Sequence, residues 1–159
     1  IFALAESRNE SPFIVMCDSL EDPHNLGAIL RSAEASGVHG VIIPKRNSVT
    51  LNYTVAKTSA GAIEYVPVVK VANLPAAIDE LKSRGVWIFG ADMDGTDYTA
   101  LDYSGSIALV IGSEGKGIGR LVREKCDFIA SLPMRGKINS LNASVAAGIL
   151  MFEAAKHRN

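Results

Sequence analysis

Short apolar segments alternate along this chain with longer segments in which apolar residues recur at helical spacing. The apolar segments are rich in Val and Ile and nearly continuous in apolarity, which is typical of strands buried on both faces of a sheet. We expect strands at residues 13–18, 38–44, 65–71, 86–92, 106–112 and 127–133, and helices at 22–37, 54–62, 74–85, 118–126 and 140–158. Residues 94–106 are predicted to be a polar loop. This order of elements predicts one α/β domain with a mostly parallel sheet and helices on both faces.

Composition narrows the class of protein further. The chain has 159 residues, of which 48% are hydrophobic, enough for one domain with its own core. It has no continuous apolar run of membrane-spanning length and no basic-then-apolar leader, so we expect neither a membrane span nor secretion. Cys17 and Cys126 are far apart, with no CxxC pair and no clustered histidines, which argues against zinc and disulfides. Two such cysteines suit the reducing cytoplasm, where each would be a small core hydrophobe.

Charge is unevenly distributed although the formal net charge is only −1. Most of the charged side chains among residues 1–30 are acidic, whereas residues 113–137 are rich in cations. These cations are Lys116, Arg120, Arg123, Lys125, Arg135 and Lys137. A polyanion would meet this second region more readily, although a solvated helix face of mixed charge gives the same pattern.

The stretch VIGSEGKGIG, residues 110–119, resembles a nucleotide-binding loop but fits neither phosphate template. A P-loop needs GxxxxGK followed by Ser or Thr, and here Val110 and Gly117 stand at the two ends of that pattern. The dinucleotide motif GxGxxG also fails, because the glycines run GxGxG. The glycines would still let the backbone approach a ligand closely where the strand ends. A plain strand-to-helix turn is the alternative.

Polar residues gather where the predicted parallel strands end. They are Asn25, Arg31, Glu114, Ser140 and Asn142. Ligands of open α/β sheets bind outside the carboxyl ends of the strands, so these side chains are expected to converge on one site. Each also has a structural interpretation: Asn25 and Ser140 as helix N-caps, and Glu114 as a charge that stabilises a helix N-terminus.

Three ordered blocks make this chain similar to the SpoU family of RNA ribose 2′-O-methyltransferases, in the SPOUT superfamily. They are DPHNLGAILRSAEASGVHGVIIPK (22–45), LVIGSEGKGIGRLV (109–122) and LPMRGKINSLNASVAAGILMFEA (132–154). With the segments between them, the resemblance runs from about residue 13 to about residue 156. Three motifs in order are far more specific than any single glycine pattern.

The resemblance implies S-adenosylmethionine as cofactor, held by three loops in a deep C-terminal trefoil knot. By motif position its contacts would be Ala91, Ile111, Gly112, Ser113, Gly115, Leu132, Met134 and Leu141. The resemblance also implies that Arg31, Asn25, Glu114, Ser140 and Asn142 form the catalytic site. The resemblance implies that Arg31 helps to deprotonate the ribose 2′-hydroxyl. Because arginine is a poor general base, binding of the target phosphate and electrostatic lowering of the pKa of the hydroxyl is the chemically simpler role, and the sequence leaves the protonation role of Arg31 open.

Within the family, the motifs look most like bacterial enzymes that methylate a guanosine of 23S ribosomal RNA. Residues 1–12 would then be the end of a linker from an N-terminal RNA-binding domain, and residues 13–159 the catalytic domain. The family also implies a homodimer through the knot region, and the last helix offers Val145, Ile149 and Phe152 to either the core or that interface. A transfer-RNA methyltransferase and an inactive cofactor- or RNA-binding module are the alternatives.

Overall fold

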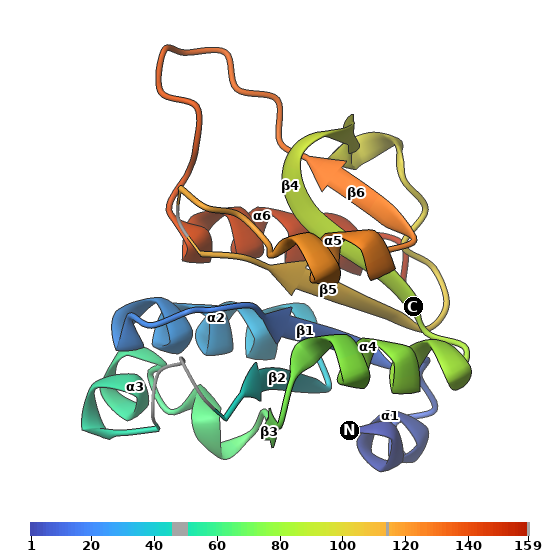
Figure 1. Ribbon diagram of the computed structural model, residues 1–159. Coiled ribbons are helices and arrows are strands. Elements are labelled where there is room, and N and C mark those ends of the chain that lie inside the picture. Colours follow the sequence, from blue (N-terminus) through green and yellow to red (C-terminus); the bar gives the residue numbers. More distant parts are fainter. Residues whose placement is uncertain (46–50, 114, 159) are drawn as a thin grey trace.

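A single parallel β-sheet organises the molecule in the computed structural model (Figure 1), which describes residues 1–45, 51–113 and 115–158. Its strands are β1 (Phe13–Cys17), β2 (Gly40–Pro44), β3 (Val68–Val71), β4 (Trp87–Asp97), β5 (Ile107–Ile111) and β6 (Phe128–Ser131). They lie in the order β3-β2-β1-β5-β4-β6, and every neighbouring pair is parallel. The predicted parallel sheet is confirmed.

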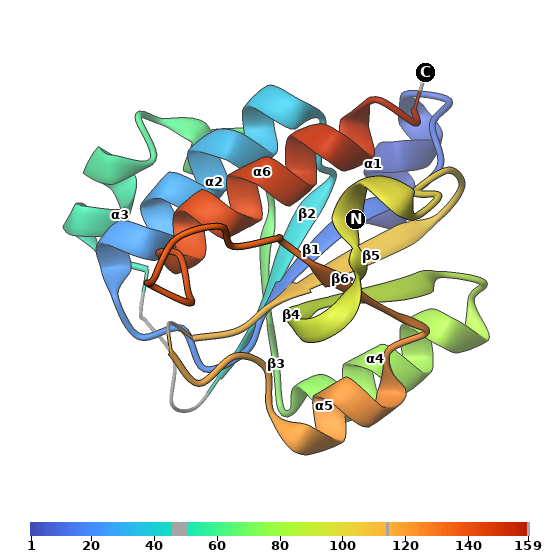
Figure 2. The same ribbon diagram turned by 90° about the horizontal axis from the view of Figure 1, so that it is seen from above.

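Helices cover both faces of the sheet, as the sequence predicted. They are α1 (Phe2–Ser7), α2 (Pro23–Ser36), α3 (Tyr53–Thr58), α4 (Leu74–Ser83), α5 (Arg120–Lys125) and α6 (Ala143–Ala155), with short 3₁₀ turns η1 (Ala62–Glu64) and η2 (Tyr98–Ala100). Figure 2 shows α2 and α6 side by side over one face, with α4 and α5 over the other. None of the described helices has both the length and the apolarity that crossing a bilayer requires.

Alternate residues of the strands supply the two cores. In β1, Phe13, Val15 and Cys17 face the α2 and α6 layer, whereas Ile14 and Met16 face the α4 and α5 layer. All five are completely buried, which is why β1 reads as a continuous apolar run rather than an alternating one. Burial also raises the pKa of the Cys17 thiol to about 12, so this cysteine is an inert core side chain, as predicted. Cys126 is partly buried and free.

The ends of α2 follow the chemistry of its sequence. Asp22 caps the first turn by accepting a hydrogen bond from the His24 amide at 2.9 Å, and Pro23 begins the helix. Gly37 ends it in the left-handed region, with φ of 89°. The weaker helix expected at 54–62 is divided: α3 ends at Thr58, and Gly61 starts η1 with φ of 86°.

The predicted loop at 94–106 is wrong at its beginning, because β4 continues to Asp97. An irregularity in the pairing with β6 lies between Ala91 and Thr96. There Ser131 Oγ accepts from the Gly95 amide and donates to the Asp92 carbonyl, both at 2.7 Å. The strand signal was missing from the sequence because this part of β4 is solvent-exposed and carries no apolar alternation.

Residues 1–12 form part of the folded domain. They contain α1, in which Ala5 is completely buried, and Ile1 and Phe2 pack against the core under α4. The Arg84 guanidinium lies 3.8 Å from the centre of the Phe2 ring. That a further domain precedes this segment stays a prediction.

A buried histidine joins this segment to the sheet. His39 Nδ1 accepts from the Phe13 amide at 2.9 Å, so the neutral ring carries its proton on Nε2, which lies 3.1 Å from Glu10 Oε1. Burial lowers the pKa of His39 below its ordinary 6.5; the bond to Glu10 acts in the opposite direction, and the charges of Arg158 and Arg8 lower the pKa further.

We expect the stability of the chain to fall as the pH decreases below about 6.5, because the unfolded chain then binds a proton that the buried imidazole resists. His39→Gln should lose about 1–3 kcal/mol near neutral pH, through the broken hydrogen bonds, and should lose most of this pH dependence. The measurement is urea unfolding across a pH series. The control, His24→Gln at an exposed position, should keep the wild-type profile. An unchanged profile in His39→Gln would refute this role.

Candidate active site

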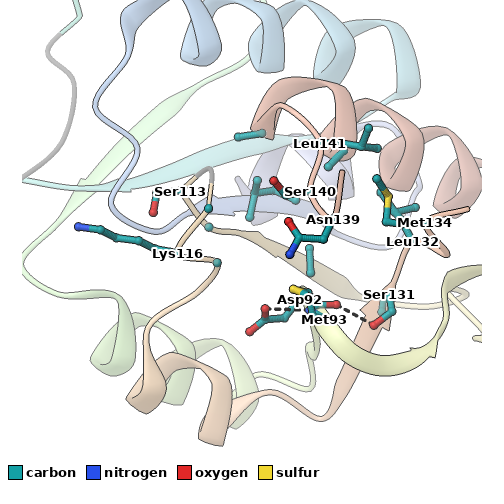
Figure 3. Close-up of a pocket in the computed structure, with 18 of the residues that line it drawn as sticks. Asp92, Met93, Ser113, Lys116, Ser131, Leu132, Met134, Asn139, Ser140 and Leu141 are labelled. Carbon is teal, nitrogen blue, oxygen red and sulfur yellow. Dashed lines mark hydrogen bonds between the residues drawn. The ribbon is translucent and has the colours of Figure 1, made fainter. Parts of the chain in front are cut away.

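A cavity of about 350 Å³ lies beyond the carboxyl end of β5, between the middle of β4 and the end of β6 (Figure 3). Three segments build it: residues 91–94 in the middle of β4, the glycine-rich loop after β5, and the stretch from the end of β6 into α6. Its lining includes the apolar side chains Ala91, Ile111, Leu132, Met134 and Leu141, together with the polar side chains of Asp92, Ser113, Lys116, Asn139 and Ser140. Such a volume, apolar walls and few polar groups are typical of small-molecule sites.

The glycine-rich loop brings backbone against backbone. A side chain on Gly112 would put its Cβ 2.2 Å from the Gly117 carbonyl carbon, so this position accepts only glycine. Gly115 and Gly117 have φ of 82° and 68°, where glycine avoids strain. The Gly117 amide donates to the Ser113 carbonyl at 2.9 Å, which closes the loop into a tight turn. The loop is therefore built for close approach, as its sequence predicted, and phosphate motifs are not needed to explain it.

Two carboxylates that the sequence analysis missed hold these loops in place. Asp18, the residue after β1, accepts at 2.7 Å from the Gly119 amide at the start of α5. Asp92 lines the cavity and forms an ion pair with Arg123 of α5 at 2.7 Å. Their positions could have identified them in the sequence, because each is a carboxylate at or just past the apolar part of a strand.

Asn25 and Asn142 meet although 117 positions separate them. Asn142 Nδ2 donates to Asn25 Oδ1 at 3.1 Å. Asn142 also caps α6, because its Oδ1 accepts from the amides of Ser144 at 2.9 Å and Val145 at 3.3 Å. The cap predicted at Ser140 is therefore wrong, and so is the alternative of Asn25 as the cap of α2, which Asp22 provides. Ser140 instead lines the cavity.

Arg31 does not line the cavity. It lies on the outer face of α2, in line with the exposed His24 and Ala35. Within the described part of the chain its guanidinium has no ion-pair or hydrogen-bond partner. Of the residues expected to converge, Ser140 lines the cavity, whereas Asn25 and Asn142 contact each other but are not part of its lining. Arg31 is not part of the lining either, and Glu114 lies outside the described residues.

The eight residues predicted to contact a cofactor all line the cavity. They are Ala91, Ile111, Gly112, Ser113, Gly115, Leu132, Met134 and Leu141. Across the described residues, no three His, Cys, Asp or Glu side chains gather where they could hold a metal ion. The cavity is thus shaped for an organic molecule held by apolar side chains and backbone.

Sequence comparison first defines a class of protein, the RNA-modifying methyltransferases. The family model described as "SpoU rRNA Methylase family" matches residues 12–152. The chain therefore belongs to the SpoU rRNA methylase family, which confirms the resemblance drawn from its three sequence blocks.

Relatives of this chain are described as TrmH family tRNA/rRNA methyltransferases. A putative TrmH family tRNA/rRNA methyltransferase, YacO, from Bacillus subtilis is 56% identical over 160 residues, covering 100% of this chain and 64% of that protein. A relative of the same description from Staphylococcus aureus (strain COL) is 58% identical over 147 residues, covering 92% of this chain and 59% of that protein. The chain thus spans less than two thirds of the length of these relatives.

Solved structures agree with the fold. The SpoU methyltransferase AviRb from Streptomyces viridochromogenes, in complex with the cofactor AdoMet, superposes with a TM-score of 0.86 at 31% identity, over 92% of this chain and 58% of that one. A TrmH/SpoU tRNA modifying enzyme from A. aeolicus gives 0.82 at 29% identity, over 98% and 82% of the two chains. The α/β architecture expected from the sequence is therefore that of solved SpoU methyltransferases.

Proposed function

We propose that this chain transfers a methyl group from S-adenosylmethionine to a ribose 2′-hydroxyl of RNA. The observation that carries the proposal is the cavity at the carboxyl edge of the sheet, with Gly112 pressed against Gly117 on its wall. Family membership and an AdoMet complex of a similar structure point to the same cofactor.

The residues of the cavity fit that cofactor. Its volume of about 350 Å³ lies within the range of small-molecule sites. Ile111, Leu132 and Leu141 offer an apolar slot suited to an adenine ring, while the neighbouring loop backbone offers amides and carbonyls to the edge of the ring. The absent Cβ at Gly112 lets the Gly117 backbone pack against it, which gives the glycine-rich loop its shape at the cavity wall.

When bound, the sulfonium group supplies an electrophilic methyl carbon. The ribose 2′-oxygen forms a bond to this carbon while the carbon–sulfur bond breaks, and the hydroxyl proton leaves to an acceptor or to solvent. The chain's task is then mainly to hold the hydroxyl in line with the methyl group, and such positioning is worth several kcal/mol, up to about 7–11.

Asn25, Ser140 and Asn142 are placed to orient the incoming nucleotide. Asn142 is immobilised because its oxygen caps α6 and its nitrogen donates to Asn25. The Asn25 oxygen accepts this bond, which leaves its amide nitrogen to donate to a phosphate or ribose oxygen. Ser140, at the cavity wall, can accept from or donate to the 2′-hydroxyl. The neighbouring Glu114 is proposed to complete this group.

The proposed target is a guanosine of 23S ribosomal RNA, as the motifs suggest. Transfer RNA is the second candidate, because the relatives' descriptions name both RNAs. A cofactor- or RNA-binding module without activity is disfavoured by the presence of the Asn25–Asn142 pair together with Ser140 in the cavity wall. The relatives are longer than this chain, which is consistent with the proposed upstream RNA-binding domain in the whole protein, and a cytoplasmic location is part of the same proposal.

A deep trefoil knot and a homodimer complete the proposal. The knot is supported by the course of the chain after β6, which crosses from the sheet edge over the cavity and then packs as α6 beside α2 (Figure 2).

The dimer is supported by α6. Val145, Ile149 and Phe152 are 51%, 36% and 50% exposed, whereas Ala147, Leu150 and Met151 fill the core. An apolar stripe left outside the core is a candidate interface.

Arg31→Ala should lower methyl transfer by about a hundredfold or more, because a guanidinium that stabilises the developing charge is lost. Binding of S-adenosylhomocysteine, measured by calorimetry, should be unchanged, since Arg31 is not in the cavity lining. Arg8→Ala, an exposed control, should keep full activity. Parallel loss of ligand binding in Arg31→Ala would instead indicate a structural arginine.

Arg31 is further proposed to serve the cavity of the other subunit, since it lies on the outer face of α2, next to α6. Mixing inactive Arg31→Ala with inactive Gly112→Ala should then restore activity: hybrid dimers pair an intact cavity with an intact arginine from its neighbour. The measurement is methyl transfer to RNA after subunit exchange. Mixtures that stay inactive although hybrid dimers form would place Arg31 at its own subunit's cavity.

A further inference from the structure

The basic stretch at residues 113–137 divides into two parts in the structure. Every cation of α5 is neutralised: Arg120 by Glu124 at 3.1 Å, Arg123 by Asp92 at 2.7 Å, and Lys125 by Asp79 at 2.9 Å. These charges connect α5 to itself, to β4 and to α4. They contribute little to the field that a polyanion would meet.

Lys116, Arg135 and Lys137 are different. All three are exposed, and within the described ranges none has an ion pair or a side-chain hydrogen bond. Residues 132–142 contain no Asp or Glu, so this loop carries only positive charge. The cations therefore remain available to an external anion.

Both loops that carry these cations border the cavity. Lys116 belongs to its lining, and in Figure 3 its side chain extends away from Asn139 and Ser140 toward the outside. Arg135 and Lys137 lie between two lining residues, Met134 and Asn139, in a segment that projects from the body of the fold (Figure 1). The carboxylates of the lining are on β4: Asp92, which is paired with Arg123, and the exposed Asp94.

We propose that Lys116, Arg135 and Lys137 bind the RNA phosphates on either side of the nucleotide whose ribose enters the cavity. This inference rests on the proposed function and names the residues that position its substrate. Cations on loops that border the cavity suit a single-stranded segment, whose backbone can follow them while the target nucleotide turns inward. The cations of α5, which are paired with carboxylates of the chain, take no part in this contact.

The test is the salt dependence of binding, followed by the anisotropy of a fluorescein-labelled single-stranded RNA. The slope of log K against log salt is negative, and each lost phosphate contact makes it less steep by about 0.7 for a single strand. Arg135→Ala/Lys137→Ala should therefore decrease the steepness by about 1.4, and Lys116→Ala by about 0.7. S-adenosylhomocysteine should bind Arg135→Ala/Lys137→Ala as it binds the wild type, because neither residue lines the cavity, and this separates RNA positioning from cofactor binding.

Arg8→Ala/Lys70→Ala is the matched control, because it also removes one arginine and one lysine, both exposed and both outside the cavity lining. Its slope should equal that of the wild type. An unchanged slope in Arg135→Ala/Lys137→Ala, or an equal decrease in the control, would overturn the assignment while leaving the proposed function intact. Wild-type chain that binds no RNA even at low salt would overturn both.

Discussion

The parallel pairing of β5 between β1 and β4 determines where every loop of the site lies. Cys17 is in register with Ile111, so β1 and β5 end at one level, and Gly90 of β4 is in register with Val110, where β4 continues past them to Asp97. The chain leaving β1 then supplies Asp18, whose carboxylate accepts from Gly119 at the far end of the glycine-rich loop. A slip of this register would move the loop, its helix α5 and the cavity wall together.

Glycine allows the backbone of the glycine-rich loop to pack closely at this position. The backbone of residue 112 touches that of residue 117, and this contact exists only because Gly112 has no Cβ. The same glycines explain why this stretch resembles a nucleotide-binding loop without having its spacing. A loop of either kind brings its backbone close to a ligand, but a phosphate site also needs a ring of backbone amides and a cation. In this chain the neighbouring lysine, Lys116, extends outward from the cavity instead.

The proposed catalytic residues lie on two surfaces. Cofactor-sized space and the asparagine pair lie at the carboxyl edge, while Arg31 stands on the outer face of α2, beside the α6 layer. Arg31 has no side-chain partner among the described residues, and the apolar stripe of α6 lies outside the core; the proposed second subunit would account for both.

Sequence alone predicted the strands whose side chains are buried on both faces, because short, continuous apolar runs such as those of β1, β2 and β5 are typical of such strands. It missed the end of β4, which is exposed and therefore lacks a pattern, and it misplaced the α6 cap because Ser140 and Asn142 are both good caps. The Asn25–Asn142 bond and the outward position of Arg31 depend on how α2 packs against α6, which no local pattern encodes.

Calorimetry with S-adenosylhomocysteine tests the central claim most directly, namely that the backbone of the glycine-rich loop makes the cofactor site. Wild-type chain and Gly136→Ala, where an added Cβ meets nothing within 4 Å, should bind it equally. Gly112→Ala should not bind, while circular dichroism shows it folded; Gly115→Ala, at φ of 82°, serves if Gly112→Ala fails to fold. Absence of binding to folded wild-type chain, or equal binding by all variants, would contradict the claim.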